Sequence, residues 1–126
     1  MKERTPVFVY GTLLRGESNS ALMRKAKYVG EATTKPEYEL VDFGWYPAMV
    51  SGGKTSIRGE VYLVDDAQLA DIDRLEGYPG FYTRETIQLA DGAMVSVYTL
   101  SAKQAGGRPV IASGDWRERD GKDRGN

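Results

Sequence analysis

Residues 6–13 read PVFVYGTL, an apolar run that is followed by a turn opened by Gly11. The apolar run predicts a buried strand over residues 6–10, and the glycine predicts that the chain leaves the strand there. A glycine turn at the end of a strand can direct several backbone N–H groups towards one acceptor. The stretch therefore predicts a binding site for an anion or an oxyanion, formed by residues 10–13.

Further elements follow outward from this strand. Hydroxyl and amide groups at residues 18–20 are expected to cap a short helix over residues 21–27. Alternating apolar side chains predict a strand over residues 57–64, with one face in the core and one partly polar face that carries Glu60. Other expected strands cover residues 38–43 and 46–50, a last short strand or turn lies at 110–112, and a hairpin pairs 82–89 with 93–100 across residues 90–92.

A second helix is expected from Asp65 or Asp66 as the N-cap to Gly77 just beyond its end. Its apolar stripe is formed by Leu69 and Ile72, and Glu76 falls on the same stripe two turns after Leu69. Glu76 is therefore expected to face inward rather than towards solvent.

Two effects predict a raised pKa for Glu76. Burial disfavours the charged carboxylate, and the negative end of the helix dipole acts in the same direction. A carboxylate tuned in this way suits a general base that works near neutral pH. The other reading is a solvated glutamate at a frayed helix end. Four other acidic residues are weaker candidates for the general base. Asp71 is expected to face solvent, and Asp73 lies on the same helix. Glu60 and Glu85 lie in strands, where each is expected to pair with a neighbouring arginine.

The composition excludes several kinds of site. The chain has no histidine and no cysteine, which removes the Ser-His-Asp triad, the Cys-His pair and the usual zinc sites. Its net charge of −1 gives no electrostatic reason to bind nucleic acid. Gly11 and Gly16 have the spacing of a phosphate-binding loop, but Glu17 stands where that motif needs lysine. With no signal peptide or apolar run long enough to span a membrane, the expected location is the cytoplasm.

The elements together predict an α+β fold, a small and strongly curved mixed sheet or barrel flanked by two short helices. At 126 residues the chain is long enough for one core. We expect a single domain over residues 1–116, followed by a charged and mobile tail over residues 117–126.

The sequence resembles the γ-glutamylcyclotransferase-like family in its small, compact form. The resemblance spans residues 7 to 116 and rests on four motifs: VYGTL at 9–13, RGEVY at 58–62, LEGY at 75–78 and YTR at 82–84. It implies a small β-barrel flanked by helices, in which Tyr10, Gly11, Thr12 and Leu13 line the substrate pocket and Glu76 occupies the position of the catalytic glutamate.

The family's chemistry, as the resemblance implies it, is the cyclisation of a γ-glutamyl amine or amino acid to 5-oxoproline. This needs a small-molecule γ-glutamyl substrate and neither a metal nor an organic cofactor. Tyr82, just after the helix, is expected either to offer its phenol to the same pocket or to pack with a hydrogen-bonded tip.

Three alternatives stay open on the sequence alone. The same pocket can bind a small carboxylate or γ-glutamyl compound without turning it over. An aromatic patch of Trp45, Tyr46 and Tyr78 can serve an interaction protein. Water activated by Glu76 can instead hydrolyse the amide and release glutamate.

Overall fold

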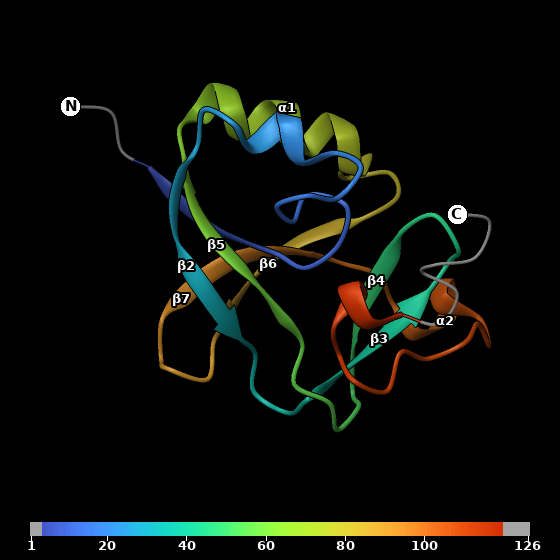
Figure 1. Ribbon diagram of the computed structural model, residues 1–126. Helices are drawn as coiled ribbons and strands as arrows, with labels where there is room; N and C mark the ends of the chain where they lie inside the picture. The colour runs from blue at the N-terminus through green and yellow to red at the C-terminus, as the bar shows by residue number, and fades with distance from the viewer. Residues whose placement is uncertain (1–3, 120–126) are drawn as a thin grey trace.

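The computed structural model describes residues 4–119, and these form one curved, seven-stranded sheet with helices at its margins (Figure 1). The strand order is β2-β5-β1-β7-β4-β3, and β6 pairs with β7 beside this path. The strands are β1 (Thr5–Val9), β2 (Lys27–Thr33), β3 (Tyr38–Asp42), β4 (Pro47–Ser51), β5 (Arg58–Val64), β6 (Thr83–Gln88) and β7 (Met94–Thr99). The helices are η1 (Ser20–Met23), α1 (Asp66–Glu76), α2 (Ala102–Ala105) and η2 (Trp116–Glu118).

The sheet is mixed but it is not a closed barrel, so this part of the sequence prediction is wrong. β1 pairs with β5 antiparallel along five residues, whereas its parallel contact with β7 is the single pair Val7 and Ser96. The parallel contact between β4 and β7 is likewise one pair, Met49 and Thr99. A barrel needs a continuous ladder around its circumference, whereas β2 and β3 end the strand order of this sheet without pairing with each other.

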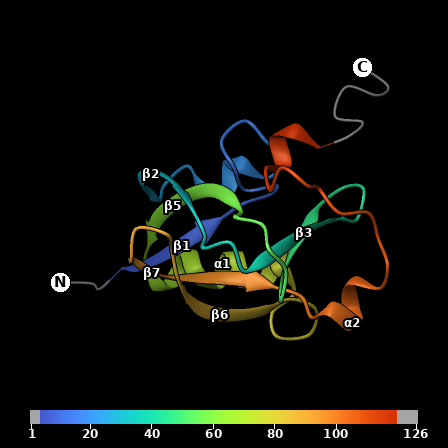
Figure 2. The ribbon, with the colours of Figure 1, turned by 90° about the horizontal axis from the view of Figure 1, so that it is seen from below.

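Helices cover different parts of the curved sheet. α1 lies across one side of it near β1 and β5, together with η1 and the loop before it (Figure 1). α2 lies at the far end of β7 beside the β3–β4 hairpin (Figure 2), where Ala105 packs against Val41 and Val50. The main core lies between these layers and includes Phe8, Ile72 and Trp116.

The helix predicted before Gly77 is confirmed in detail. The Asp65 side chain accepts a hydrogen bond from the Gln68 backbone, and the Gln68 side chain accepts one from the Asp65 backbone. This reciprocal capping box starts α1. Gly77 ends it in a left-handed conformation, with φ of 67°, which glycine adopts at little cost. Glu76 is therefore the last residue of the helix.

The helix predicted over residues 21–27 is wrong. Only Ser20–Met23 is helical, as a single 3₁₀ turn, and Lys27 already begins β2, a strand that the sequence analysis missed. Short helices gain little from their own hydrogen bonds. β2 instead gains a long antiparallel ladder with β5, which carries a bulge between Tyr28 and Gly30.

The predicted polar face of β5 is also wrong, since Glu60 and Tyr62 are buried and Leu63 is only half-buried. β5 is an interior strand between β1 and β2, and the chain at Arg15 and Arg117 packs over its Glu60 side chain. Residues 117–119, which were assigned to the tail, form part of η2 and its end, and the rest of that predicted tail lies outside the described residues. None of the helices in residues 4–119 has the length and apolar character that crossing a bilayer requires.

Candidate functional site

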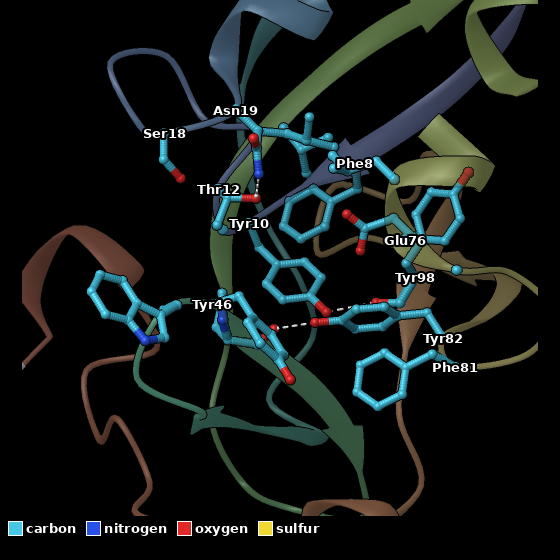
Figure 3. Close-up of a pocket in the computed structure, with 17 residues that line it drawn as sticks. Phe8, Tyr10, Thr12, Ser18, Asn19, Tyr46, Glu76, Phe81, Tyr82 and Tyr98 are labelled. Atoms are coloured by element: carbon cyan, nitrogen blue, oxygen red, sulfur yellow. Dashed lines mark hydrogen bonds between the residues drawn. The ribbon is translucent and has the colours of Figure 1, made fainter. Parts of the chain in front are cut away.

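A cavity of about 500 Å³ opens where the end of β1, the end of α1 and the start of β4 meet (Figure 3). All six residues that the sequence singled out line it: Tyr10, Gly11, Thr12, Leu13, Glu76 and Tyr82. Segments far apart in the chain are thus brought to one place, because β1 passes through the middle of the sheet and α1 returns across it.

Glu76 supplies the acidic group of the cavity. Its carboxylate points into the space beside Phe8 and above Tyr10 (Figure 3), and it has no hydrogen-bond or ion-pair partner among residues 4–119. Burial raises the pKa of Glu76 from 4.5 to about 7. The prediction of a raised pKa therefore agrees with the local environment, and desolvation is its cause.

The glycine loop, residues 10–15, forms the opposite wall. At Gly11 a Cβ atom would lie 2.6 Å from Pro47 Cγ and 2.7 Å from Pro47 Cδ. Real side chains do not tolerate such distances, so only glycine lets the loop lie this close to β4. The loop is held by hydrogen bonds from Leu14 N–H to Gly11 O (3.0 Å) and from Asn19 N–H to Thr12 O (2.8 Å).

In these bonds the loop residues Gly11 and Thr12 act as acceptors through their carbonyl groups, so their own backbone N–H groups are not used. Within residues 4–119, the backbone N–H groups of Gly11, Thr12 and Leu13 have no intrachain acceptor. The Thr12 hydroxyl is fixed by a hydrogen bond from the Asn19 side-chain amide (3.0 Å). The loop therefore keeps three adjacent N–H donors free in residues that line the cavity, and successive free N–H groups of this kind can bind an anion.

The two predicted tyrosines line the cavity with their rings, and their hydroxyl groups are engaged elsewhere. Tyr10 donates to Tyr98 O (2.6 Å) and accepts from Met49 N–H (3.0 Å). Tyr82 donates to Pro47 O (2.6 Å). Burial, with the nearby charge of Glu76, raises the pKa of both phenols. Both therefore stay neutral, and of the two readings for Tyr82 the geometry matches packing with a hydrogen-bonded tip.

The rival carboxylates lie outside the cavity lining. Asp71 is exposed and pairs with Arg74, as expected of a solvent-facing residue. Asp73 instead pairs with Arg84 and accepts from the Tyr98 hydroxyl.

The sequence analysis expected the two strand glutamates to pair with neighbouring arginines, and this expectation is wrong. Glu85 accepts a hydrogen bond from the Thr99 hydroxyl (2.6 Å). Glu60 is buried and binds Arg15 N–H, Tyr62 and Arg117.

Sequence reasoning missed several parts of the lining. Trp45, which the sequence analysis considers as part of an exposed aromatic patch, lines the cavity while 89% exposed, so it stands at the mouth. Tyr46 and Phe81 also line the cavity, and their rings meet edge to face with centroids 6.2 Å apart. Phe8 and Tyr98 come from strand interiors and Asn19 from a loop, and no local pattern marks such residues.

The charge of the lining is simple. Glu76 is its only ionisable group apart from tyrosines, and none of the described lining residues is a lysine or an arginine. Among residues 4–119 no cluster of three or more potential ligands that could hold a metal ion is found. An anionic group entering this cavity would meet backbone N–H groups rather than a side-chain cation.

Comparisons with known proteins identify the family of this chain. The family model described as "Gamma-glutamyl cyclotransferase, AIG2-like" matches residues 7–118. A Vibrio cholerae protein provisionally named a gamma-glutamylcyclotransferase is 45% identical over 114 residues, which cover 90% of this chain and 96% of that protein. The gamma-glutamylcyclotransferase family protein YtfP of Escherichia coli K12 is 39% identical over 115 residues, covering 90% of this chain and 97% of that protein.

Solved structures show the same fold. The solution structure of Escherichia coli YtfP superimposes with a TM-score of 0.71 at 36% identity, covering 92% of this chain and 99% of that one. A mouse AIG2-like protein superimposes with a TM-score of 0.77 at 29% identity, covering 90% and 89%. The chain therefore belongs to the gamma-glutamylcyclotransferase, AIG2-like family.

Proposed function

We propose that this protein cyclises a γ-glutamyl amine or amino acid to 5-oxoproline and releases the free amine. The observation that carries the proposal is Glu76, an unpaired carboxylate with a pKa of about 7 in a cavity whose opposite wall offers free N–H donors. Family membership supports the same class of reaction.

The reaction needs no nucleophile from the protein. The α-amine and the γ-carbonyl belong to one molecule, so holding the substrate folded lets the amine attack and close a five-membered ring. Glu76 takes a proton from the α-ammonium group, and the amine nitrogen then bonds to the γ-carbon. When the original amide bond breaks, Glu76 gives this proton to the departing nitrogen, then takes the second proton of the ring nitrogen and releases it to solvent, so that the lactam keeps one N–H.

The amides of Gly11, Thr12 and Leu13 are the proposed partners of the substrate's α-carboxylate. That group carries a full negative charge throughout the reaction, and the described lining has no cation to meet it. Binding it also holds the α-amine on the side of Glu76. The rings of Tyr10 and Tyr82 form the apolar wall that keeps water away from the folded substrate.

The test is mass-spectrometric detection of 5-oxoproline from a panel of γ-glutamyl amines and γ-glutamyl amino acids. We expect product from the native chain, and a rate lower by about 100-fold or more in Glu76→Gln, because the variant has no group that accepts the proton. Asp71→Asn is the matched control, since it removes an exposed carboxylate from the same helix.

The products separate the alternatives. Free glutamate in place of 5-oxoproline would identify a hydrolase that uses water. Absence of any product, with the native protein folded and still binding 5-oxoproline, would identify a binding protein on the same scaffold.

A further inference from the structure

Glu60 is a buried carboxylate that the proposed reaction does not use. The residue is 3% exposed, and both of its oxygens are occupied. Oε1 accepts from Arg15 N–H (3.0 Å) and from the Tyr62 hydroxyl (3.3 Å), and Oε2 accepts from Arg117 Nη2 (3.0 Å). A charge buried this deeply is costly unless it is paired, so the three donors are needed to keep Glu60 ionised at this position.

The position of Glu60 connects it to the cavity. Glu60 lies opposite Val9 in the antiparallel ladder of β1 and β5. Its side chain takes the N–H group of Arg15, at the other end of the glycine loop. One residue therefore holds both ends of the loop that presents the free amides of residues 11–13.

Arg117, near the C-terminal end of the described chain, also binds the end of the glycine loop. Its guanidinium group donates to Glu60 Oε2 and also to Arg15 O at 2.7 Å. The peptide groups on both sides of Arg15 are thus fixed by a single ion pair. Asp115 holds Arg117 in turn by accepting from its backbone N–H (2.9 Å).

A second ion pair joins the same two segments. Arg119 lies 3.3 Å from the Glu17 carboxylate, just beyond the glycine loop. Trp116, directly before Arg117 in the sequence, is 1% exposed and anchors η2 in the core. Figure 1 shows η2 near the loop that follows β1, far from it in sequence.

We propose that Glu60 and Arg117 are positioning residues that set the direction of the N–H groups of Gly11, Thr12 and Leu13 and so determine how tightly the substrate's carboxylate is held. The proposal rests on the proposed function for its effect on turnover. Its structural part, control of the loop by the ion pair, is independent of which reaction takes place.

The kinetic test uses Arg117→Gln and Glu60→Gln with the γ-glutamyl compound that the panel turns over fastest. A hydrogen bond to a charged group is worth enough to change binding about 10-fold. We expect KM to rise about 10-fold in Arg117→Gln while kcat changes less than about threefold, because the carboxylate grip is lost and Glu76 is untouched. Glu60→Gln should change KM in the same direction.

Arg58→Gln is the matched control. Arg58 forms an ion pair with Asp115 at 3.7 Å, so it holds the same C-terminal segment without contacting the glycine loop. Arg58→Gln should lower the free energy of unfolding only by the small amount expected for a surface ion pair, and it should leave KM unchanged.

A second measurement is made on the same proteins without any turnover. Backbone amide signals of residues 10–15 are recorded by NMR, alone and on titration with 5-oxoproline, which carries the carboxylate. We expect both variants to shift the signals of residues 11–13 and to speed hydrogen exchange at Arg15, and we expect 5-oxoproline to bind about 10-fold more weakly.

Unchanged amide signals in residues 10–15 of folded Glu60→Gln would overturn the proposal, whatever the activity. So would an equal KM in Arg117→Gln and Arg58→Gln. If the native chain forms no 5-oxoproline, the proposed function fails, and the NMR signals still decide whether the ion pair controls the loop. Glu60→Gln keeps an acceptor for Arg15 N–H, so it serves if Arg117→Gln does not fold.

Discussion

At the scale of single residues, Gly11 shows how a small side chain can be required by its neighbours. Gly11→Ala would place a Cβ atom inside contact distance of the Pro47 ring, so the loop must move away from β4. We expect a loss of about 1–3 kcal/mol of stability and a rise in KM, because the displaced amides no longer meet the carboxylate. Thermal unfolding and steady-state kinetics measure the two effects.

Gly80→Ala is the control for that substitution. A Cβ atom there would meet only Gly77 O, at an ordinary distance of 3.5 Å. An equal loss of activity in both variants would show that the fit of Gly11 against Pro47 has no special importance.

The pKa of Glu76 makes a prediction for the pH dependence of catalysis. Only the ionised carboxylate can accept the proton of the α-ammonium group, and burial raises the pKa of Glu76 to about 7. We expect kcat/KM to rise about tenfold per pH unit below pH 7 and to level off above it. A pH profile of the native chain measures this, and a midpoint near the ordinary glutamate value would contradict the assignment of Glu76 as the base.

At the scale of elements, α1 is tied to the sheet close to its functional end. Arg84 of β6 donates to Asp73 Oδ1 (2.6 Å), and the Tyr98 hydroxyl of β7 donates to the same oxygen (2.5 Å). Asp73 precedes Glu76 by one turn, and Tyr98 lines the cavity. This cluster therefore fixes the end of the helix against the cavity wall.

Asp73→Asn is expected to lower stability by about 1–2 kcal/mol, since it removes charged hydrogen bonds in a half-buried cluster. It should also reduce kcat, because the end of α1 carries the base. Asp71→Asn, which breaks an exposed pair on the same helix, should change stability by less than about 0.5 kcal/mol. Chemical denaturation measures the free energy of unfolding of both variants. An equal loss of stability in the two would show that the Asp73 cluster does not fix the end of α1.

The elements that the sequence predicted well are those with local signals. α1 has a capping box at its start and a left-handed glycine at its end, and the β6–β7 hairpin has a short polar turn. β2 could not be predicted, because its strand conformation depends on the ladder with β5. That the sheet stays open could not be predicted either, because it depends on whether strands far apart in the fold pair, and β2 and β3 end the strand order without pairing with each other.

The candidate site divides in the same way. Glu76 and Gly11 stand at a helix end and a strand end, where a sequence pattern can place them. Glu60 was predicted to pair across its strand, and the structure gives it Arg117 instead, a residue assigned to the tail. A contact between residues so far apart has no local signature, and this is why the ion pair behind the glycine loop was missed.

At the scale of the whole molecule, the raised pKa of Glu76 makes the free energy of unfolding depend on pH. The pKa of Glu76 is about 7 in the folded state, whereas an ordinary glutamate, as in the unfolded chain, has a pKa of 4.5. Between these two values the folded state binds more protons than the unfolded state, so stability falls as pH rises through this window. Below about 4.5 both states are protonated and the penalty is absent, and above about 7 it is complete.

Glu76→Gln removes the charge and therefore the penalty. We expect the variant to be more stable than the native chain by about 1–3 kcal/mol near pH 8, a range that allows for solvent reaching the partly exposed carboxylate, and to show little gain near pH 4.5. Urea denaturation of both proteins across this range measures the difference. A gain that is equal at all pH values would mean that the glutamate is ordinary and that glutamine merely packs better. A gain that grows with pH, in a variant that has lost its activity, would show that the protein gives up stability to keep a carboxylate in an apolar cavity.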